Sequence, residues 1–117
     1  MTEMPLRIYH NNRCSKSRAA YQLITEKGIA VEVVDYLRTP PSREELGDLL
    51  RKLGMKPEQL VRRGEAVFKE HYAGRSLSDD DWLDALAEHP ILIERPIVVH
   101  GERAVLGRPP ERVLELL

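Results

Sequence analysis

The chemistry available to this chain centres on Cys14, the only cysteine among its 117 residues. It follows a β-prone run over residues 6–9 and a polar loop, at the point where an amphipathic helix is predicted to begin. The first turn of a helix leaves backbone N–H groups unsatisfied and carries the positive end of the helix dipole, so it favours thiolate over thiol. Because thiolate is the nucleophilic form, this position favours a reactive sulfur over a small buried apolar side chain.

Polar residues flank Cys14 on both sides. Ser15 and Ser17 can donate hydrogen bonds to the sulfur or to a bound oxyanion, and the helix start offers N–H groups to the same anion. His10 allows two interpretations: a strand-end histidine satisfied by the backbone, or electrostatic and proton-transfer support for the thiolate. A metal site is disfavoured, because zinc normally takes about four His or Cys ligands and the chain has no second cysteine.

Three arginines stand beside glycine or proline or at the end of an element. Arg95 and Arg108 each precede a proline, and Arg62, with Arg63 beside it, is predicted to end a short helix. A guanidinium fork held at such a position recognises tetrahedral oxyanions well. Their spacing alone does not establish that these side chains converge on Cys14.

Strand and helix patterns alternate at both ends of the chain. The predicted elements there are a strand over 6–9, a helix over 15–27 closed by Gly28, a strand over 29–36, a hairpin over 97–100 and 103–106, and a final helix over 111–117. The first three form a βαβ unit whose strands run parallel through a right-handed crossover. This order predicts a thioredoxin-like α/β fold, in which helices cover a small mixed sheet.

The middle of the chain has a helical pattern throughout. The predicted helices there run over 42–53, capped by Ser42 and closed by Gly54, over a short stretch after Pro57 that includes 60–63, over 66–72, and from the cap Ser78 to 88. We therefore expect one domain over 1–117, with a thioredoxin-like part over 5–38 and 91–117. Residues 39–90 are expected to form an inserted helical subdomain.

Composition narrows the class of protein. Apolar residues make up 42%, enough for a core, and charged residues make up 32% but nearly cancel to a net charge of -1. That balance argues against a nucleic-acid or anionic-membrane binder, and the apolar runs are too short to span a bilayer. No signal peptide is visible, and one cysteine cannot form an internal disulfide. We expect a cytoplasmic protein.

The motifs around Cys14 and the arginines resemble those of the ArsC family, the glutaredoxin-linked arsenate reductases, and most of all its ArsC-like subgroup. The matching stretches follow the family's order over nearly the whole chain: Tyr9-His10-Asn11-x-x-Cys14-x-x-Ser17-Arg18, Thr39-Pro40-Pro41-Ser42, Leu60-Val61-Arg62, Arg95-Pro96-Ile97 and Gly107-Arg108-Pro109. The resemblance implies a thioredoxin-like fold with a helical insertion. It also implies a cis bond between Arg95 and the proline before the third strand.

The same resemblance implies roles for the candidate residues. Cys14 would be the nucleophile, His10 its electrostatic neighbour, and Arg62, Arg95 and Arg108 the oxyanion-binding triad, with Arg63 as a stand-in for Arg62. The implied reaction is reduction of arsenate to arsenite through a Cys14 adduct, as in arsenical resistance. Glutathione would be the co-substrate and glutaredoxin the partner, with no metal and no bound cofactor.

Two other functions remain open on the residues alone. One is a glutathione-dependent thiol/disulfide oxidoreductase of the same fold, without arsenate activity. The other is a non-enzymatic binding module like the related Spx-type regulators, which bind RNA polymerase. Those regulators carry a CxxC switch, whereas Asn11 and Ser17 occupy the positions where a second cysteine would stand.

Overall fold

The computed structural model describes residues 6–11 and 13–116. The chain forms two compact units, Met1–Thr39 with Arg95–Leu117 and Pro40–Glu94. Residues 91–94, expected in the thioredoxin-like part, pack with the helical unit instead. The backbone N–H of Glu94 donates to the carbonyl of Leu60 at 2.8 Å, which binds this connector to that unit. The grouping of both units into a single domain stays a prediction.

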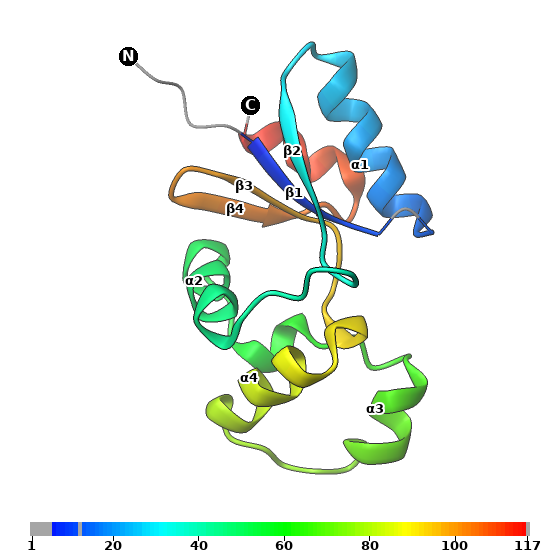
Figure 1. Ribbon diagram of the computed structural model, residues 1–117, viewed down its shortest axis with the longest axis vertical. Helices are drawn as coiled ribbons and strands as arrows, with labels where there is room; N and C mark the ends of the chain where they lie inside the picture. The colour runs from blue at the N-terminus through cyan, green and yellow to red at the C-terminus, as the bar shows by residue number, and fades with distance from the viewer. Residues whose placement is uncertain (1–5, 12, 117) are drawn as a thin grey trace. The chain divides into compact units, whose positions relative to one another are not determined.

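The first unit is built on a four-stranded mixed sheet of order β2-β1-β3-β4 (Figure 1). Its strands are β1 (Leu6–His10), β2 (Val31–Asp35), β3 (Ile97–His100) and β4 (Arg103–Leu106). β1 runs parallel to β2 and antiparallel to β3, which pairs antiparallel with β4. The βαβ unit and the hairpin predicted from the sequence are therefore confirmed.

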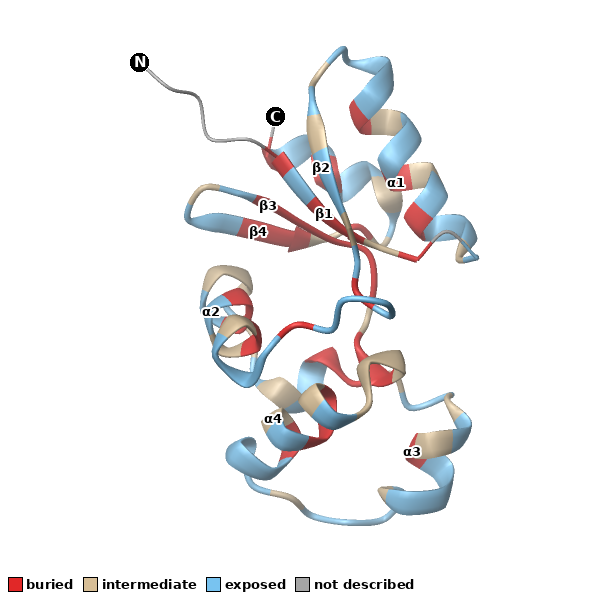
Figure 2. Ribbon diagram, in the orientation of Figure 1, coloured by how far each residue is buried: buried red, intermediate tan, exposed pale blue. Residues whose placement is uncertain are grey.

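One face of this sheet is covered by α1 (Ser15–Glu26) and by a C-terminal 3-10 helix, η3 (Pro110–Leu116) (Figure 1). The core between the sheet and these helices contains Leu6, Ile8, Ala20, Ile24, Val98, Val105, Val113 and Leu116. Figure 2 shows the buried colour along much of β1, β3 and β4. Gly28 closes α1 as expected, with a φ of 73°. The α-helix expected over 111–117 is wrong in type, because this short proline-led segment takes the tighter 3-10 form. Leu117 lies outside the described residues.

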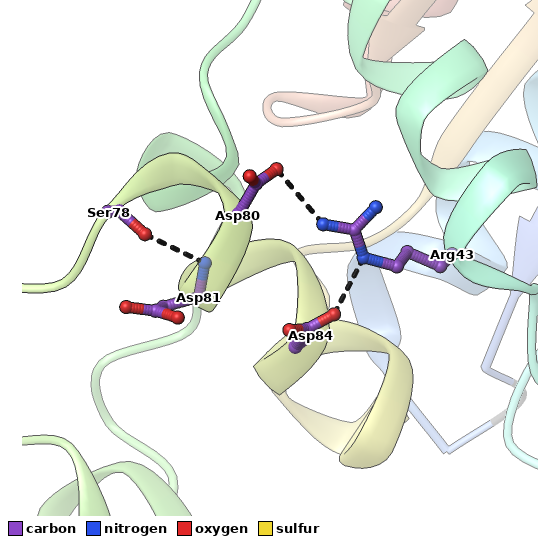
Figure 3. Close-up of polar contacts among 5 residues, drawn as sticks. All are labelled: Arg43, Ser78, Asp80, Asp81 and Asp84. Carbon is purple, nitrogen blue, oxygen red and sulfur yellow. Dashed lines mark hydrogen bonds and ion pairs between the residues drawn. The ribbon is translucent and has the colours of Figure 1, made fainter.

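The second unit contains three α-helices among the described residues: α2 (Arg43–Leu53), α3 (Ala66–His71) and α4 (Asp79–Glu88). The hydroxyl oxygens of Ser42 and Ser78 accept the backbone N–H groups of Glu45 and Asp81, each at 3.1 Å, so both predicted caps are confirmed. Figure 3 shows the guanidinium of Arg43 between two carboxylates of α4. Its nitrogens lie 3.0 Å from a carboxylate oxygen of Asp80 and 2.6 Å from one of Asp84. These exposed ion pairs connect α2 to α4.

The short helix expected to include residues 60–63 is wrong at its C-terminal end. A 3-10 helix, η1 (Pro57–Leu60), stops before Val61, which pairs with Ile93 in an isolated antiparallel bridge. The N–H of Arg62 donates to the carbonyl of Leu92 at 2.7 Å. The distant segment begins with a short 3-10 helix, η2 (Pro90–Leu92). Residues 61 and 62 therefore form backbone hydrogen bonds with this segment in place of local helical ones.

Gly107, next to the candidate residue Arg108, has no room for a side chain. Its N–H donates to the carbonyl of Pro96 at 2.9 Å. A Cβ at this position would lie 2.8 Å from Pro96 Cγ, 3.3 Å from Ala20 Cβ and 3.3 Å from Val113 Cγ1. A separation of 2.8 Å is too short for two carbon atoms, so the backbone or the proline ring would have to move.

We therefore expect Gly107→Ala to lower the free energy of unfolding by about 1–3 kcal/mol, measured by urea denaturation. The matched control is Gly47→Ala within α2, where nothing lies within 4 Å of the added Cβ. That substitution is expected to raise stability by about 0.5–1 kcal/mol, since alanine favours helix over glycine. Equal stability of Gly107→Ala and the wild type would contradict the packing described for this turn.

Over the residues described, the chain has no helix with the length and apolar character needed to cross a membrane.

Candidate active site

The segments that carry the candidate residues of the first unit all connect to the same end of the sheet. β1 and β2 both end there, with His10 and Asp35 paired in register. β3 begins at the same end, since Ile97 lies opposite Tyr9, and β4 finishes there, since Leu106 lies opposite Ile97. Carboxyl ends of parallel strands are the usual place for ligand sites in α/β sheets. The segments that leave this end carry Cys14, Tyr36, Arg95 and Arg108.

Cys14 is the N-cap residue of α1, as predicted. Its side chain makes no capping hydrogen bond, and its residue is partly exposed. The N–H of Cys14 donates to the carbonyl of Asn11 at 3.0 Å, and the side-chain Oδ1 of Asn11 accepts the N–H of Arg13 at 3.0 Å. Asn11 is buried and thus shapes the loop, a role the sequence interpretation missed. The tendency of asparagine to form such side-chain turns was the available signal.

Several groups act on the sulfur of Cys14. Partial burial raises its pKa, but hydrogen bonds from the backbone N–H of Ser17, the side chain of Arg95 and the backbone N–H of Lys16, with the charge of Arg95, outweigh that effect. The net result is a thiol pKa below its ordinary value. The helix start and one arginine therefore stabilise the thiolate, the two sources of stabilisation expected for a reactive cysteine.

The side chain of Ser17 is directed to His10 rather than to solvent. Ser17 is fully buried, and its Oγ lies 2.7 Å from Nδ1 of His10. The same oxygen accepts the N–H of Asn11 at 3.1 Å. The hydroxyl thus joins the end of β1 to the start of α1, and Ser17 acts on the Cys14 sulfur through its backbone N–H. Ser15, the other predicted donor, is the exposed first residue of α1.

The pKa of His10 is lowered, which favours its neutral form. Desolvation by burial lowers the pKa, the carboxylate of Asp35 raises it and the charge of Arg18 lowers it, leaving the pKa below its ordinary value. A neutral imidazole beside the loop contributes polarity and hydrogen bonding rather than a fixed positive charge.

The opposite charges of Arg18 and Asp35 predict pKa shifts of opposite sign at His10. Arg18→Gln is expected to raise the pKa of His10, because it removes a repulsive positive charge, whereas Asp35→Asn is expected to lower it. The NMR titration of the His10 imidazole in the wild type and the two variants measures both effects. Shifts in the same direction would show that these side chains do not act on His10 electrostatically.

Arg95 and Tyr36 are two further buried residues with polar groups at this end of the sheet. Arg95 is 8% exposed and Tyr36 is 1% exposed. The bond between Arg95 and Pro96 is cis, as predicted, and so is the bond between Arg108 and Pro109. Burial raises the pKa of Tyr36 to about 12, although Arg95 and Asn11 act to lower it. The sequence interpretation missed Tyr36, whose position directly after a parallel strand was the only signal.

The second unit contains the remaining candidates, Arg62 and Arg63. Arg62 forms ion pairs with Glu65 at 3.0 Å and Glu94 at 3.4 Å, and its side chain is 22% exposed. Arg63 is 57% exposed and pairs with Glu58 at 2.9 Å. The more buried position and the two carboxylate partners set Arg62 apart from an ordinary solvated arginine. A common oxyanion site of Arg62 with Cys14 stays a prediction.

Within residues 6–11 and 13–116, no group of three or more His, Cys, Asp or Glu side chains is placed to hold a metal ion.

Comparisons with known proteins cover nearly the whole chain. The ArsC family profile matches residues 9–116. The chain is 46% identical to an arsenate reductase of Neisseria meningitidis serogroup A over 96% of this chain and 97% of that protein. It is 47% identical to the uncharacterized protein YfgD of Escherichia coli K12, over 96% of each chain.

The fold agrees with a solved structure of the same group. An arsenate reductase from Vibrio cholerae superposes with a TM-score of 0.94 at 50% sequence identity, covering 99% of this chain and 100% of that one. The thioredoxin-like α/β fold predicted from the sequence is confirmed by this likeness. With a profile match over most of its length and relatives well above 40% identity, the chain belongs to the ArsC family.

Proposed function

We propose that this protein is an arsenate reductase that takes its electrons from glutathione and glutaredoxin. The observation that carries the proposal is the placement of Cys14, whose thiolate is stabilised by the first turn of α1 and by Arg95. Arsenate reductases of similar sequence support arsenate as the substrate. The reducing thiols required belong to a reducing compartment, so we place the protein in the cytoplasm.

In the proposed reaction the Cys14 thiolate attacks the arsenic of bound arsenate, and an oxygen leaves as water, forming a sulfur–arsenic bond. Glutathione then displaces a second oxygen and binds the same arsenic through its sulfur. The glutaredoxin thiolate attacks the glutathione sulfur. The bond between that sulfur and arsenic breaks, and its electron pair passes to arsenic. Arsenic(V) becomes arsenic(III), glutathione and glutaredoxin are left as a mixed disulfide, and water releases arsenite from Cys14. A one-cysteine enzyme needs both external thiols for this balance.

The oxyanion is assigned to positively charged and N–H donors. Arg95 neutralises the charge next to the sulfur, and Arg108 leaves the same end of the sheet. Arg62 would complete the triad, exchanging its ion pairs with Glu65 and Glu94 for the oxyanion. Backbone N–H groups of the first turn of α1 add donors, with the hydroxyl of Ser15 at the helix start. A guanidinium fork suits a tetrahedral oxyanion because it donates two parallel hydrogen bonds.

The test is a coupled assay of arsenite formation with arsenate, glutathione and glutaredoxin. We expect arsenite to form in the complete mixture and to fall to the uncatalysed level when glutathione or glutaredoxin is omitted. Measuring arsenite itself avoids the signal that glutathione oxidation alone would give. No arsenite from the complete mixture at millimolar arsenate would contradict the proposal.

A thiol/disulfide oxidoreductase is the second candidate. The observation that favours it is that the groups lowering the pKa of Cys14 all lie in the first unit, and a thiolate there needs no oxyanion to react with a disulfide. This alternative predicts rapid reaction with glutathione disulfide together with no arsenite formation, so the same coupled assay separates the two functions.

A further inference from the structure

A buried hydroxyl at the sheet end has no role in the mechanism above. The phenol oxygen of Tyr36 is buried and has no hydrogen-bond partner among the described residues. A buried polar group left unpaired destabilises a folded protein, so such groups are rare and each needs an explanation, of which a bound ligand is one. Tyr36 directly follows β2, whose last residue pairs with His10 at the end of β1, so it stands beside the loop that leads to Cys14.

The groups acting on the phenol identify its surroundings. Its neighbours are the guanidinium of Arg95 and the side chain of Asn11, and the charge of Cys14 also acts on it. These are the residues that shape and charge the candidate site. The hydroxyl of Tyr36 therefore belongs to the same cluster as the nucleophile.

The chemistry of these neighbours leaves the phenol proton without an acceptor. A guanidinium only donates hydrogen bonds, so Arg95 cannot accept from Tyr36. Asn11 acts to lower the pKa of Tyr36, the direction expected of a donor facing the phenol rather than an acceptor, and its Oδ1 accepts the N–H of Arg13 at 3.0 Å. A phenol with a pKa of about 12 remains protonated at neutral pH and so keeps its proton available. Two kinds of donor, one charged and one neutral, thus stand beside the sulfur.

We propose that the hydroxyl of Tyr36 is a further oxyanion-binding group, donating its hydrogen bond to an oxygen of the anion bound at Cys14 next to Arg95. This inference rests on the proposed oxyanion chemistry of Cys14 and extends it by one named neutral donor. A phenol adds a hydrogen bond without adding charge, so it contributes to binding while leaving the thiolate charge to Arg95 and the helix start.

The substitution Tyr36→Phe has effects of opposite sign on stability and on binding. Removing an unpaired buried hydroxyl leaves the aromatic ring in place, so the melting temperature should stay the same or rise. Loss of a hydrogen bond to a charged ligand should weaken oxyanion binding by about 10- to 100-fold. A tyrosine with a purely structural hydroxyl bond would show a lower melting temperature and unchanged binding.

The experiment measures how arsenate protects Cys14 from iodoacetamide in the absence of glutathione, so no turnover is needed. Each variant is compared with its own alkylation rate without arsenate, which removes any change in thiol reactivity. We expect the half-protecting arsenate concentration of Tyr36→Phe to be about 10- to 100-fold above that of the wild type. The matched control is Tyr9→Phe, a buried tyrosine whose hydroxyl interacts with Arg7, and it should protect at the wild-type concentration.

Overlapping protection curves for Tyr36→Phe and the wild type would overturn the inference while leaving the proposed function intact. Absence of protection in the wild type itself would overturn both. If Tyr36→Phe does not fold, fluorotyrosine-labelled wild type decides the question by ¹⁹F NMR. After the signals of Tyr9, Tyr21 and Tyr72 are assigned with their own Phe variants, the remaining signal must shift on arsenate addition, and a signal that stays in place would refute the proposed contact.

Discussion

Replacing Cys14 with serine is expected to abolish arsenite formation, with a loss of at least about 10³-fold in the coupled assay. A serine hydroxyl remains protonated at neutral pH and is a weak nucleophile without an adjacent base. The fold should be unaffected or slightly stabilised, because the Cys14 side chain makes no capping bond at the start of α1 and serine is a good N-cap residue. A loss of activity with an unchanged or higher melting temperature is therefore the expected combination.

The control for this substitution is Gln22→Ala on the same helix. Gln22 is exposed, and its side-chain amide donates to the carboxylate of Glu26 at 3.0 Å. We expect full arsenite formation from this variant. A Cys14→Ser protein that keeps a tenth or more of the wild-type rate would exclude a covalent step on this sulfur.

Replacing Arg95 with alanine should have the second largest effect. It removes a hydrogen bond and a positive charge that lower the pKa of Cys14, so the pKa of the thiol should rise. It also removes a buried donor for the oxyanion, for which we expect a loss of about 10²- to 10³-fold in arsenite formation. Arg95→Lys keeps the charge but lacks the planar fork, so its activity should lie between that of the wild type and that of Arg95→Ala.

The pH dependence separates the two contributions of Arg95. The thiolate fraction of the alanine variant recovers as pH rises through the raised pKa of Cys14, so alkylation should approach the wild-type rate at alkaline pH. Arsenite formation should not recover, because the oxyanion donor is still missing. The control is Arg112→Ala, an exposed arginine of η3 paired with Glu115, which should leave both measurements unchanged. Recovery of both activities at high pH would limit Arg95 to a role in thiol ionisation.

The parts of the site that depend on local sequence were predictable. A β-prone run, a polar loop and an amphipathic pattern place Cys14 at the start of a helix, and the structure has it as the N-cap. Gly28 and Gly54 close their helices where their φ angles of 73° and 68° require glycine. These features depend on residues within one or two turns of each other, which single-sequence patterns describe well.

The parts that depend on distant contacts were not predictable from patterns alone. Val61 leaves the expected helix because it pairs with Ile93, far along the chain. Cys14 and Arg95 lie at the same end of the sheet because β1 and β3 pair in antiparallel register. Tyr36 ends a run of β-branched residues, and from the sequence alone it cannot be distinguished from an ordinary strand residue. Its unpaired hydroxyl emerges only once its neighbours are placed around it.

The measurement that tests the account most directly is the pH profile of Cys14 alkylation by iodoacetamide. The chain has a single cysteine, so the rate reports on this thiol without separation of signals. The groups at the start of α1 and Arg95 predict a midpoint below about 8.5, the ordinary thiol value. A midpoint at or above that value would contradict a stabilised thiolate, and with it both the arsenate and the disulfide chemistry proposed for Cys14.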